Sequence, residues 1–467
     1  MPAVRKVGNK DFLATLLLVL MAGLAALAAA VQILKNAPAD DGTYVPREIE
    51  ITPAMELLRE YVRIDTTAGK ERAGAEFLRD YLSRFGIDSE IIEPEPGRSS
   101  IYARLEGIEP DGGLLLLSHI DVKDADPANW TYPPFEGGIF MNFMWGRGTL
   151  DMKGIAICHL LAFVDAAKSG KPLKHDLVFL STADEESGSR VGMEWLAVNR
   201  PDLFEGIDYA VTEGGITEMV REKIAYWAIE SGSKQFVTAR LRASTPEKIE
   251  EARSVLAREF DEASPDRIDP EVREYFEAIA EHRIEYGEAL SDIDRAVEGG
   301  SFAALPATYR MLTQNNIYVW NPSADGDGAS AEMAAALLPG EDPAKFVERL
   351  RALTTPLDVE IVVQWQSASG PVPFSSIRTE FFSEIERVIH ETYGSTIDVG
   401  PYLNPRGGTD CRYVRRIGIL CYGFLPYPVS FFQSQGIHGT DEHIQLDWFG
   451  QGVDATRELV RRHVSGG

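Results

Sequence analysis

The sequence contains few cysteines and few basic residues for its length. Its 467 residues include 3 cysteines, and Lys and Arg number 46 against 72 Asp and Glu, which gives a formal net charge of -26. So acidic a chain lacks the basic surface that phosphate binding requires, which excludes a nucleic-acid partner. The odd number and the spacing of Cys158, Cys411 and Cys421 match neither a zinc ribbon nor a disulfide scaffold. We expect buried thiols, with a Cys411–Cys421 disulfide as the alternative.

Long apolar runs are also scarce, and the one that stands out lies near the N-terminus. It extends from Phe12 to Leu34, and Arg5, Lys6 and Lys10 precede it. A helix of that length can cross the hydrocarbon core of a membrane. Basic residues before it favour a cytoplasmic N-terminus and a catalytic part on the other side. We therefore predict a membrane-anchored periplasmic or extracellular enzyme, with secretion after signal cleavage as the alternative.

The chain is longer than one ordinary hydrophobic core, so more than one domain is expected. Short apolar strands alternate with helical patterns over most of it, which predicts an α/β fold: a mixed, largely parallel sheet flanked by helices. A charge-rich helical stretch interrupts this alternation and predicts an inserted α+β lid domain. The expected division is anchor 1–34, linker 35–47, first catalytic part 48–232, lid 233–341 and second catalytic part 342–467.

Hydrophobic periodicity locates individual elements. Apolar positions at helical spacing predict helices at 52–65, 70–85, 153–168 and 376–393. Runs that are apolar on both faces predict interior strands at 114–117, 177–180 and 209–212. Each of these strands is followed by a side chain that can bind a metal. Because ligands in such sheets lie beyond the carboxyl ends of the strands, we expect the functional site there.

The first strand end carries His119 and Asp121. Zinc binds neutral imidazole well, and a nearby carboxylate can fix the orientation of the ring. A glycine-rich loop, Gly146–Gly154, then carries Asp151, whose two oxygens can bridge two metal ions. Taken alone, each motif is equally an ordinary turn or helix start.

The second strand end carries two adjacent carboxylates, Glu185 and Glu186. Their side chains point in different directions, so one can bind a metal while the other serves as a general base. Glu213, followed by two glycines, ends the third strand, and His438 lies late in the chain in the motif Gly-Ile-His-Gly. His443 is a weaker ligand candidate because its context is that of a helix start.

No single motif decides the function, but their order is specific. His-x-Asp, Gly-Arg-Gly-x-x-Asp-x-Lys-Gly, Glu-Glu, Glu-Gly-Gly and Gly-x-His-Gly follow one another along the chain. In this order they resemble the zinc exopeptidase family of aminoacylase, carboxypeptidase S, glutamate carboxypeptidase and succinyl-diaminopimelate desuccinylase. Further stretches match at 129–138, 337–340 and 407–410, and the resemblance covers 50–232 and 337–460.

The resemblance implies a dinuclear zinc hydrolase of the carboxypeptidase or N-acyl-amino-acid amidohydrolase type. Its substrate would be a small peptide or an N-acyl amino acid. It would hold two Zn²⁺ ions, for which Co²⁺ or Mn²⁺ can substitute. Glu185 would act as general base and then as general acid, and Asp121 would orient a histidine ligand.

The five implied ligands divide into two sets that share one residue. His119, Asp151 and Glu213 would hold one ion, whereas Asp151, Glu186 and His438 would hold the other. In this scheme Asp151 bridges the two ions.

The predicted lid departs from the family pattern. In the family, a Gly-His pair follows the first lid strand, and that histidine reaches a partner's active site and stabilises the oxyanion. Here the corresponding stretch, 237–246, contains no histidine. The alternative function is therefore a catalytically impaired zinc-binding or structural relative, and the choice between monomer and homodimer stays open. Candidates to replace the histidine are Arg240, Arg242, Asn315 and Asn316. Arg406 is a candidate to bind a substrate carboxylate.

Overall fold

The computed structural model describes residues 50–220, 223–260, 265–325, 328–367, 370–405 and 408–465. The predicted anchor and linker lie outside these residues, as does Arg406. Within the described ranges, no helix is both long enough and apolar enough to cross a membrane. The prediction of a membrane-anchored, extracytoplasmic enzyme is therefore withdrawn, and the described residues give no support to the membrane as a partner.

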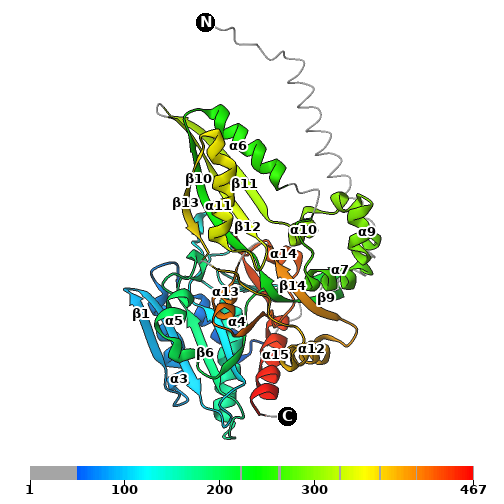
Figure 1. The fold of residues 1–467 in the computed structure, drawn as a ribbon. Coiled ribbons are helices and arrows are strands. Elements are labelled where there is room, and N and C mark those ends of the chain that lie inside the picture. The colour runs from blue at the N-terminus through cyan, green and yellow to red at the C-terminus, as the bar shows by residue number, and fades with distance from the viewer. Residues whose placement is uncertain are drawn as a thin grey trace. The chain divides into compact units, whose positions relative to one another are not determined.

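A mixed nine-stranded sheet forms the centre of the described fold (Figure 1). The strands, in chain order, are β1 Glu90–Glu95, β2 Arg98–Leu105, β3 Gly113–His119, β6 Leu177–Thr182, β7 Ile207–Thr212, β8 Ile216–Val220, β9 Lys223–Ser233, β14 Asp398–Asn404 and β15 Leu420–Gly423. Their spatial order is β1-β2-β6-β3-β7-β15-β9-β14, with β8 paired to β9. β6, β3, β7 and β15 run parallel to one another. This arrangement confirms the predicted α/β fold with a mixed sheet and helices around it.

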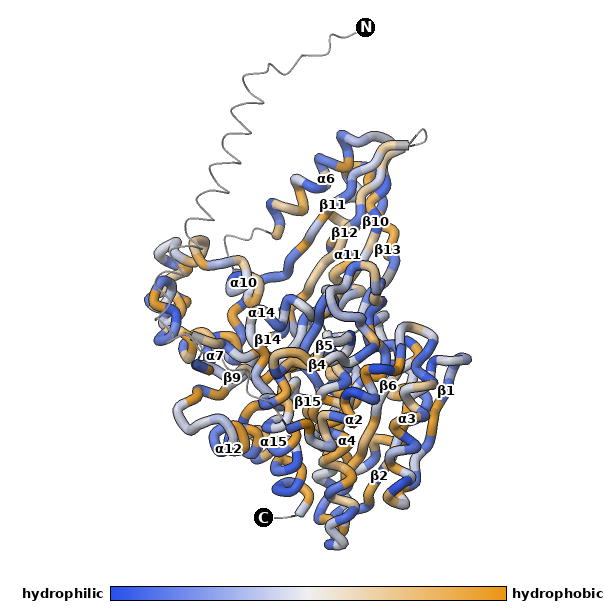
Figure 2. The backbone as a smooth tube through the Cα atoms, turned by 180° about the vertical axis from the view of Figure 1, so that it is seen from behind, coloured by the Kyte–Doolittle hydropathy of each residue, from blue (hydrophilic) through white to orange (hydrophobic). Residues whose placement is uncertain are grey.

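Helices cover both faces of this sheet because its central strands are apolar on both faces. The helices of the chain before and after the second sheet are α2 Pro53–Val62, α3 Glu71–Ser83, α4 Lys153–Lys168, α5 Met193–Asn199, α12 Glu380–Tyr393, α13 Cys411–Arg416, α14 Phe431–Ser434 and α15 Leu446–Ser465. Leu115 and Leu117 of β3 pack with Leu196 of α5. On the opposite face α4 packs against β3 and β6, and the ring of Phe163 lies 5.9 Å from that of Phe179. Figure 2 shows hydrophobic residues concentrated around α4.

A second, four-stranded sheet is formed by residues that lie between β9 and β14 of the main sheet along the chain. It has the antiparallel order β11-β12-β10-β13, with bounds β10 Gln235–Ala243, β11 Asn316–Asp325, β12 Gly328–Leu337 and β13 Glu360–Gln366. α6 (Pro246–Glu259) and α11 (Pro343–Thr354) pack against it, where Val237, Ala239 and Leu241 are buried with Leu350. Because β13 follows residue 341, this sheet takes in residues on both sides of the predicted lid boundary.

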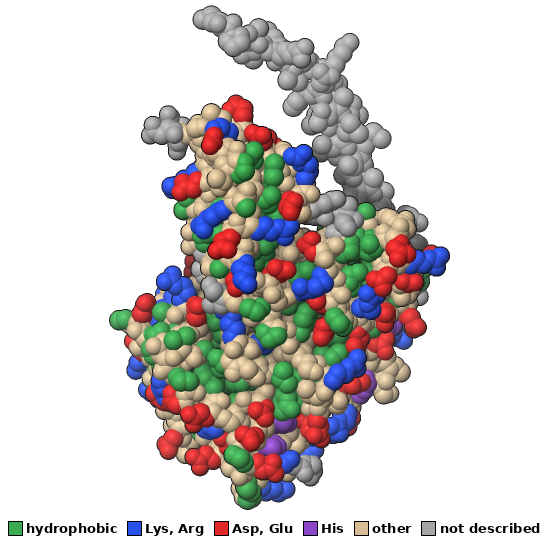
Figure 3. All heavy atoms as spheres, in the orientation of Figure 1, with side chains coloured by type: hydrophobic (Ala, Val, Ile, Leu, Met, Phe, Trp, Pro, Cys, Tyr) green, Lys and Arg blue, Asp and Glu red, His purple; other side chains and the backbone are tan. Residues whose placement is uncertain are grey.

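The charge-rich helical stretch does not belong to the second sheet alone. Beyond α6 it forms α7 Pro270–Ala280, α8 Gly287–Ser291, α9 Ile293–Glu298 and, further on, α10 Ala307–Arg310. Phe276 and Ile279 of α7 are buried in one cluster with Tyr226 of β9 and Leu403 of β14. The charged residues stay at the surface, and Figure 3 shows acidic side chains interspersed with basic ones over the described part of one face.

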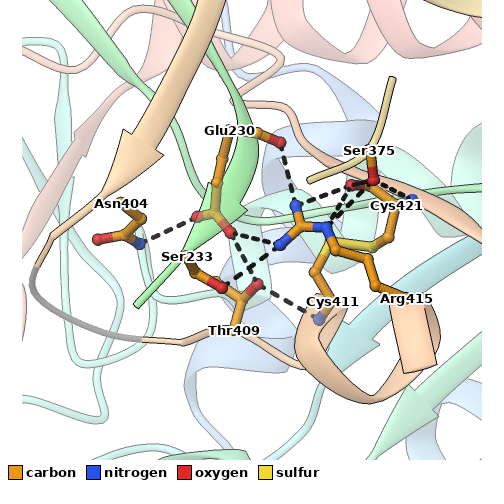
Figure 4. The surroundings of a disulfide bond; sticks show 8 residues. All are labelled: Glu230, Ser233, Ser375, Asn404, Thr409, Cys411, Arg415 and Cys421. Atoms are coloured by element: carbon orange, nitrogen blue, oxygen red, sulfur yellow. Dashed lines mark hydrogen bonds and ion pairs between the residues drawn. A yellow bond between two sulfur atoms is a disulfide. The ribbon is translucent and has the colours of Figure 1, made fainter. Parts of the chain in front are cut away.

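Cys411 and Cys421 form a disulfide that joins α13 to β15, and Cys158 is a buried thiol. The expectation of free thiols is wrong for this pair, because folding brings their Cα atoms within 5.4 Å of each other. Beside the disulfide, Arg415 donates a hydrogen bond of 2.8 Å to the Cys421 carbonyl and lies 3.5 Å from the carboxylate of Glu230 (Figure 4). The disulfide and this buried ion pair together fix α13 against β9 and β15.

Candidate metal centre

Three parallel strands and two loops bring the predicted ligands together at one edge of the main sheet. His119 is the last residue of β3, Glu213 directly follows β7, and Glu186 lies in a short 3-10 helix after β6. Asp151 precedes α4, and His438 lies in the loop after α14. Because β6, β3 and β7 are adjacent and parallel, their carboxyl ends meet at the same edge.

Asp151 lies between the two histidines. Its Oδ1 is 3.0 Å from Nε2 of His119, and its Oδ2 is 2.9 Å from Nε2 of His438. Oε1 of Glu213 lies 3.5 Å from the same nitrogen of His119, and Oε2 of Glu186 lies 3.0 Å from that of His438. The two oxygens of Asp151 therefore divide the five side chains into two groups. Each group contains one imidazole nitrogen, one Asp151 oxygen and one further carboxylate.

Asp121 contacts the centre through its main chain and its side chain. Its backbone carbonyl lies 2.8 Å from Nδ1 of His119, whereas its nearest carboxylate oxygen is 3.7 Å from that nitrogen. The carboxylate instead accepts the backbone N–H groups of Glu185 and Glu186, at 3.1 and 3.0 Å. The ring of His119 is thus oriented mainly by a carbonyl, and the Asp121 side chain holds the turn that carries the two glutamates.

The centre concentrates negative charge in a buried space. Burial raises the pKa of Glu213 to about 8, and the charge of Asp151 adds to this effect. Burial also raises the pKa of Glu185 well above its usual range, with a further contribution from the charge of Glu213. Hydrogen bonds to the neighbouring carboxylates, that of Asp151 first, raise the pKa of His438 to about 10. The carboxylates here need a cation or protons to neutralise them, and a divalent ion supplies that charge.

The set of donor atoms fits metal binding. Ligand atoms of His119, Glu185 and Glu213 lie within 4.8 Å of one another, as do those of His119, Asp151 and Glu186. Imidazole nitrogen and carboxylate oxygen are ligands that Zn²⁺ takes in proteins, and Co²⁺ and Mn²⁺ accept the same donors. The converging oxygens and nitrogens therefore fit two divalent ions.

Glycine shapes the loop that presents Asp151. Gly148 has φ +85°, a left-handed conformation that favours glycine, and a Cβ there would lie 2.9 Å from Cγ1 of Val122. A side chain at this position would push the loop away from the strand end. The Gly-Arg-Gly motif is therefore explained by close packing of the backbone beside the ligand.

Three of the four candidate replacements for the lid histidine already bind other residues of this chain. Nη2 of Arg240 lies 2.6 Å from a carboxylate oxygen of Glu332 on the adjacent strand. Oδ1 of Asn315 accepts a backbone N–H at 2.8 Å. Oδ1 of Asn316 accepts a hydrogen bond of 2.5 Å from Nζ of the buried Lys234. These three side chains hold the second sheet and its junction with β9 together.

Several buried groups behind the ligands were not identified from sequence. Asp410 accepts a hydrogen bond of 2.8 Å from the Thr182 hydroxyl at the end of β6, and Arg412 lies near enough to Glu185 for its charge to oppose the rise in that group's pKa. Arg147 and Glu442 form a buried ion pair of 2.7 Å. Arg147 and Asp410 lie within motifs that the sequence displays, so their positions carried a signal. Their contacts depend on the tertiary fold.

A known protein family matches the part of the chain that contains these candidate ligands. A family model described as peptidase family M20/M25/M40 matches residues 115–462. The chain belongs to this family. The match confirms the resemblance inferred from the order of the motifs, and with it the prediction of a metallopeptidase or amidohydrolase-type enzyme.

Curated relatives match over different lengths. Aminoacylase-1 of Sus scrofa is 24% identical over 436 residues, which cover 87% of this chain and 94% of that protein. A probable succinyl-diaminopimelate desuccinylase of Staphylococcus epidermidis is 32% identical over 191 residues, which cover 41% of this chain and 45% of that protein. The chain thus spans less than half the length of the desuccinylase but nearly all of the aminoacylase.

Solved structures share the fold. An M20 family metallo-carboxypeptidase, Sso-CP2 of Sulfolobus solfataricus, aligns with a TM-score of 0.67 at 17% identity, over 88% of this chain and 99% of that chain. Human carnosine dipeptidase 1 aligns with a TM-score of 0.62 at 14% identity, over 88% of this chain and 96% of that chain. At these identities the alignments establish the fold.

Proposed function

We propose that this M20 family member is a dinuclear zinc hydrolase that cleaves the peptide bond of a small peptide or the amide bond of an N-acyl amino acid. The observation that carries the proposal is the division of the centre by Asp151, whose two oxygens face different histidines at 3.0 and 2.9 Å. The aminoacylase relatives, aligned over 94% of their length, support the amide-cleaving type.

In this proposal the two groups of side chains each hold one ion. His119, Asp151 and Glu213 would bind the first, and Asp151, Glu186 and His438 the second. Zinc is the proposed ion because nitrogen and oxygen donors of this kind suit it, with Co²⁺ or Mn²⁺ as functional substitutes. Bound ions would polarise the scissile carbonyl and acidify the attacking water.

Glu185 is the proposed proton carrier. Its carboxylate would take a proton from the attacking water and deliver it to the leaving nitrogen, which is a poor leaving group unless protonated. The backbone N–H of Glu185 donates to the Asp121 carboxylate at 3.1 Å, which fixes the turn. Burial raises the pKa of Glu185, which makes it a stronger base than an exposed glutamate.

We propose further that the second sheet with its helices is the lid inserted into the catalytic part. A catalytically impaired relative is the second candidate function, because the stretch that follows the first lid strand has no histidine. Arg240, Asn315 and Asn316 already make other contacts, which favours the impaired relative over an enzyme in which one of them replaces the histidine.

A hydrolysis screen of the full chain separates these functions. The purified protein would be tested against N-acetyl amino acids, dipeptides and N-blocked peptides, with Zn²⁺, Co²⁺, Mn²⁺ or a chelator, while bound metal is quantified. We expect two ions per chain and hydrolysis that the chelator abolishes. Two bound ions with no hydrolysis of any substrate favour the impaired relative, and failure to bind two ions contradicts the dinuclear centre.

A further inference from the structure

Glu442 is a completely buried carboxylate directed at the loop that carries Asp151. Its Oε2 accepts hydrogen bonds from Nη1 of Arg147 at 2.7 Å and from the backbone N–H of Gly148 at 3.0 Å. Its Oε1 accepts the backbone N–H groups of Leu150 at 2.8 Å and of Asp151 at 3.1 Å. One carboxylate therefore holds the loop by four donors, two on each oxygen.

The same contacts tie that loop to the loop of His438. Nη2 of Arg147 donates to the Gly439 carbonyl at 2.7 Å, and the Gly146 N–H donates to the backbone carbonyl of Glu442 at 2.8 Å. The pairing continues outward in a small sheet of order β16-β5-β4, with bounds β4 Gly138–Phe140, β5 Phe143–Trp145 and β16 His443–Gln445. These contacts hold the loop of Asp151 and the loop of His438 together.

From this geometry we propose that Glu442, acting through Arg147 and the loop amides, is a positioning residue that sets the separation between Asp151 and His438. The inference rests on the proposed dinuclear centre and assigns Glu442 to the second of its two ion sites. Glu442 reaches the main chain of Asp151 and not its ligand oxygens, so it acts through another residue. A charged pair buried this deeply is costly unless its hydrogen bonds are satisfied, and here four donors satisfy the carboxylate.

The two ion sites depend on Glu442 to different degrees. His119 and Glu213 are held at the ends of β3 and β7, so the first group keeps two ligands on the main sheet. The second group needs His438, whose loop is fixed to the Asp151 loop by the contacts of Glu442 and Arg147. Weakening those contacts therefore affects the second site more than the first.

The decisive variant is E442Q. An amide of the same shape replaces one oxygen by a donor, so two of the four hydrogen bonds are lost. In the metal-free protein we expect the peptide covering 146–151 to exchange its amide hydrogens about tenfold faster than in the wild type. In zinc titrations we expect the second site to lose about 10- to 100-fold in affinity, while the first changes by less than about threefold.

A matched control distinguishes positioning from general stability. Glu218 is a partly buried carboxylate on β8 that pairs with Arg283 and accepts the Tyr275 hydroxyl at 3.0 Å. E218Q should lower the unfolding temperature but leave the ratio of the two zinc affinities unchanged. R147K, which keeps the charge but not the forked geometry, should shift the ratio in the same direction as E442Q, and it takes the place of E442Q if that variant does not fold.

The inference is overturned if E442Q, or R147K in its place, keeps the wild-type affinity ratio and the wild-type exchange of 146–151. It is equally overturned if E218Q shifts the ratio as much. A wild-type protein that binds fewer than two ions contradicts the proposed function instead. The exchange measurement on metal-free protein still tests the positioning role in that case.

Discussion

The proposed role of Glu185 requires its carboxylate to lie beside the candidate ligands and to stay free to carry a proton. E185Q keeps the shape and removes the base, so we expect the turnover number to fall by about 10²- to 10⁴-fold while two ions stay bound. Metal analysis and steady-state kinetics on the same preparation check this. The control is E186Q, which should lose bound metal. Undiminished hydrolysis by E185Q would refute the proposed role.

His159 offers a prediction that is independent of catalysis. Its ring is buried in α4, and burial lowers its pKa to about 3. Since the folded-state pKa lies below the unfolded value, the unfolded chain binds the extra proton, and stability is lost as the pH falls below the unfolded value of about 6.5. We expect this group to cost about 2 kcal/mol of unfolding free energy between pH 7 and pH 5.

Urea unfolding of the wild type and H159L at several pH values measures this contribution. The variant should lack that share of the pH dependence, whatever its stability at pH 7. Parallel curves for the two proteins would show that His159 is not the neutral buried group described here.

At the scale of elements, hydrophobic periodicity predicted the position of helices that bury one continuous face. α4 spans the predicted 153–168, and α2 and α3 lie within the predicted helices. The helix expected at 376–393 begins later, at Glu380, because Thr379 caps it by accepting the Phe382 N–H at 3.1 Å. The charge-rich stretch divides between two sheets, which its own pattern of charges does not reveal.

The disulfide is the strongest covalent constraint on an element. It closes a loop of 10 residues between α13 and β15, and the chain-entropy model attributes about 2–3 kcal/mol to such a loop. We expect a reductant to lower the unfolding free energy by up to about that amount. Urea unfolding with and without reductant measures the effect, and the double variant C411S/C421S should show no response. An unchanged wild type would contradict the disulfide.

At the scale of the whole molecule, bound metal should couple the parts of the chain that lie before and after the second sheet. His119 comes before the second sheet in the chain and His438 comes after it, and both contact the carboxylate of Asp151. With each ion at about 100 times its dissociation constant, binding contributes about 2.7 kcal/mol per ion. For a chain of this length, two ions should raise the unfolding temperature by roughly 5 °C.

Calorimetry before and after chelation checks this expectation. Stability should return when Zn²⁺ is added back and should not respond to Mg²⁺, which prefers all-oxygen, octahedral ligands. A chelator that leaves the unfolding temperature unchanged would argue against metal binding to the folded state.

The sequence by itself determined which residues are candidate ligands and in what order they come, because His119, Asp151, Glu186, Glu213 and His438 each stand in a local motif that marks a strand end or a loop. It also determined the α/β class, since apolar runs and helical spacing are local properties. Which groups support the ligands was decided by the tertiary structure. Arg147 and Glu442 are 295 residues apart in the chain, and no local pattern reports a contact over that distance. The Cys411–Cys421 pairing was decided in the same way, because only packing of α13 on β15 brings the two sulfurs together.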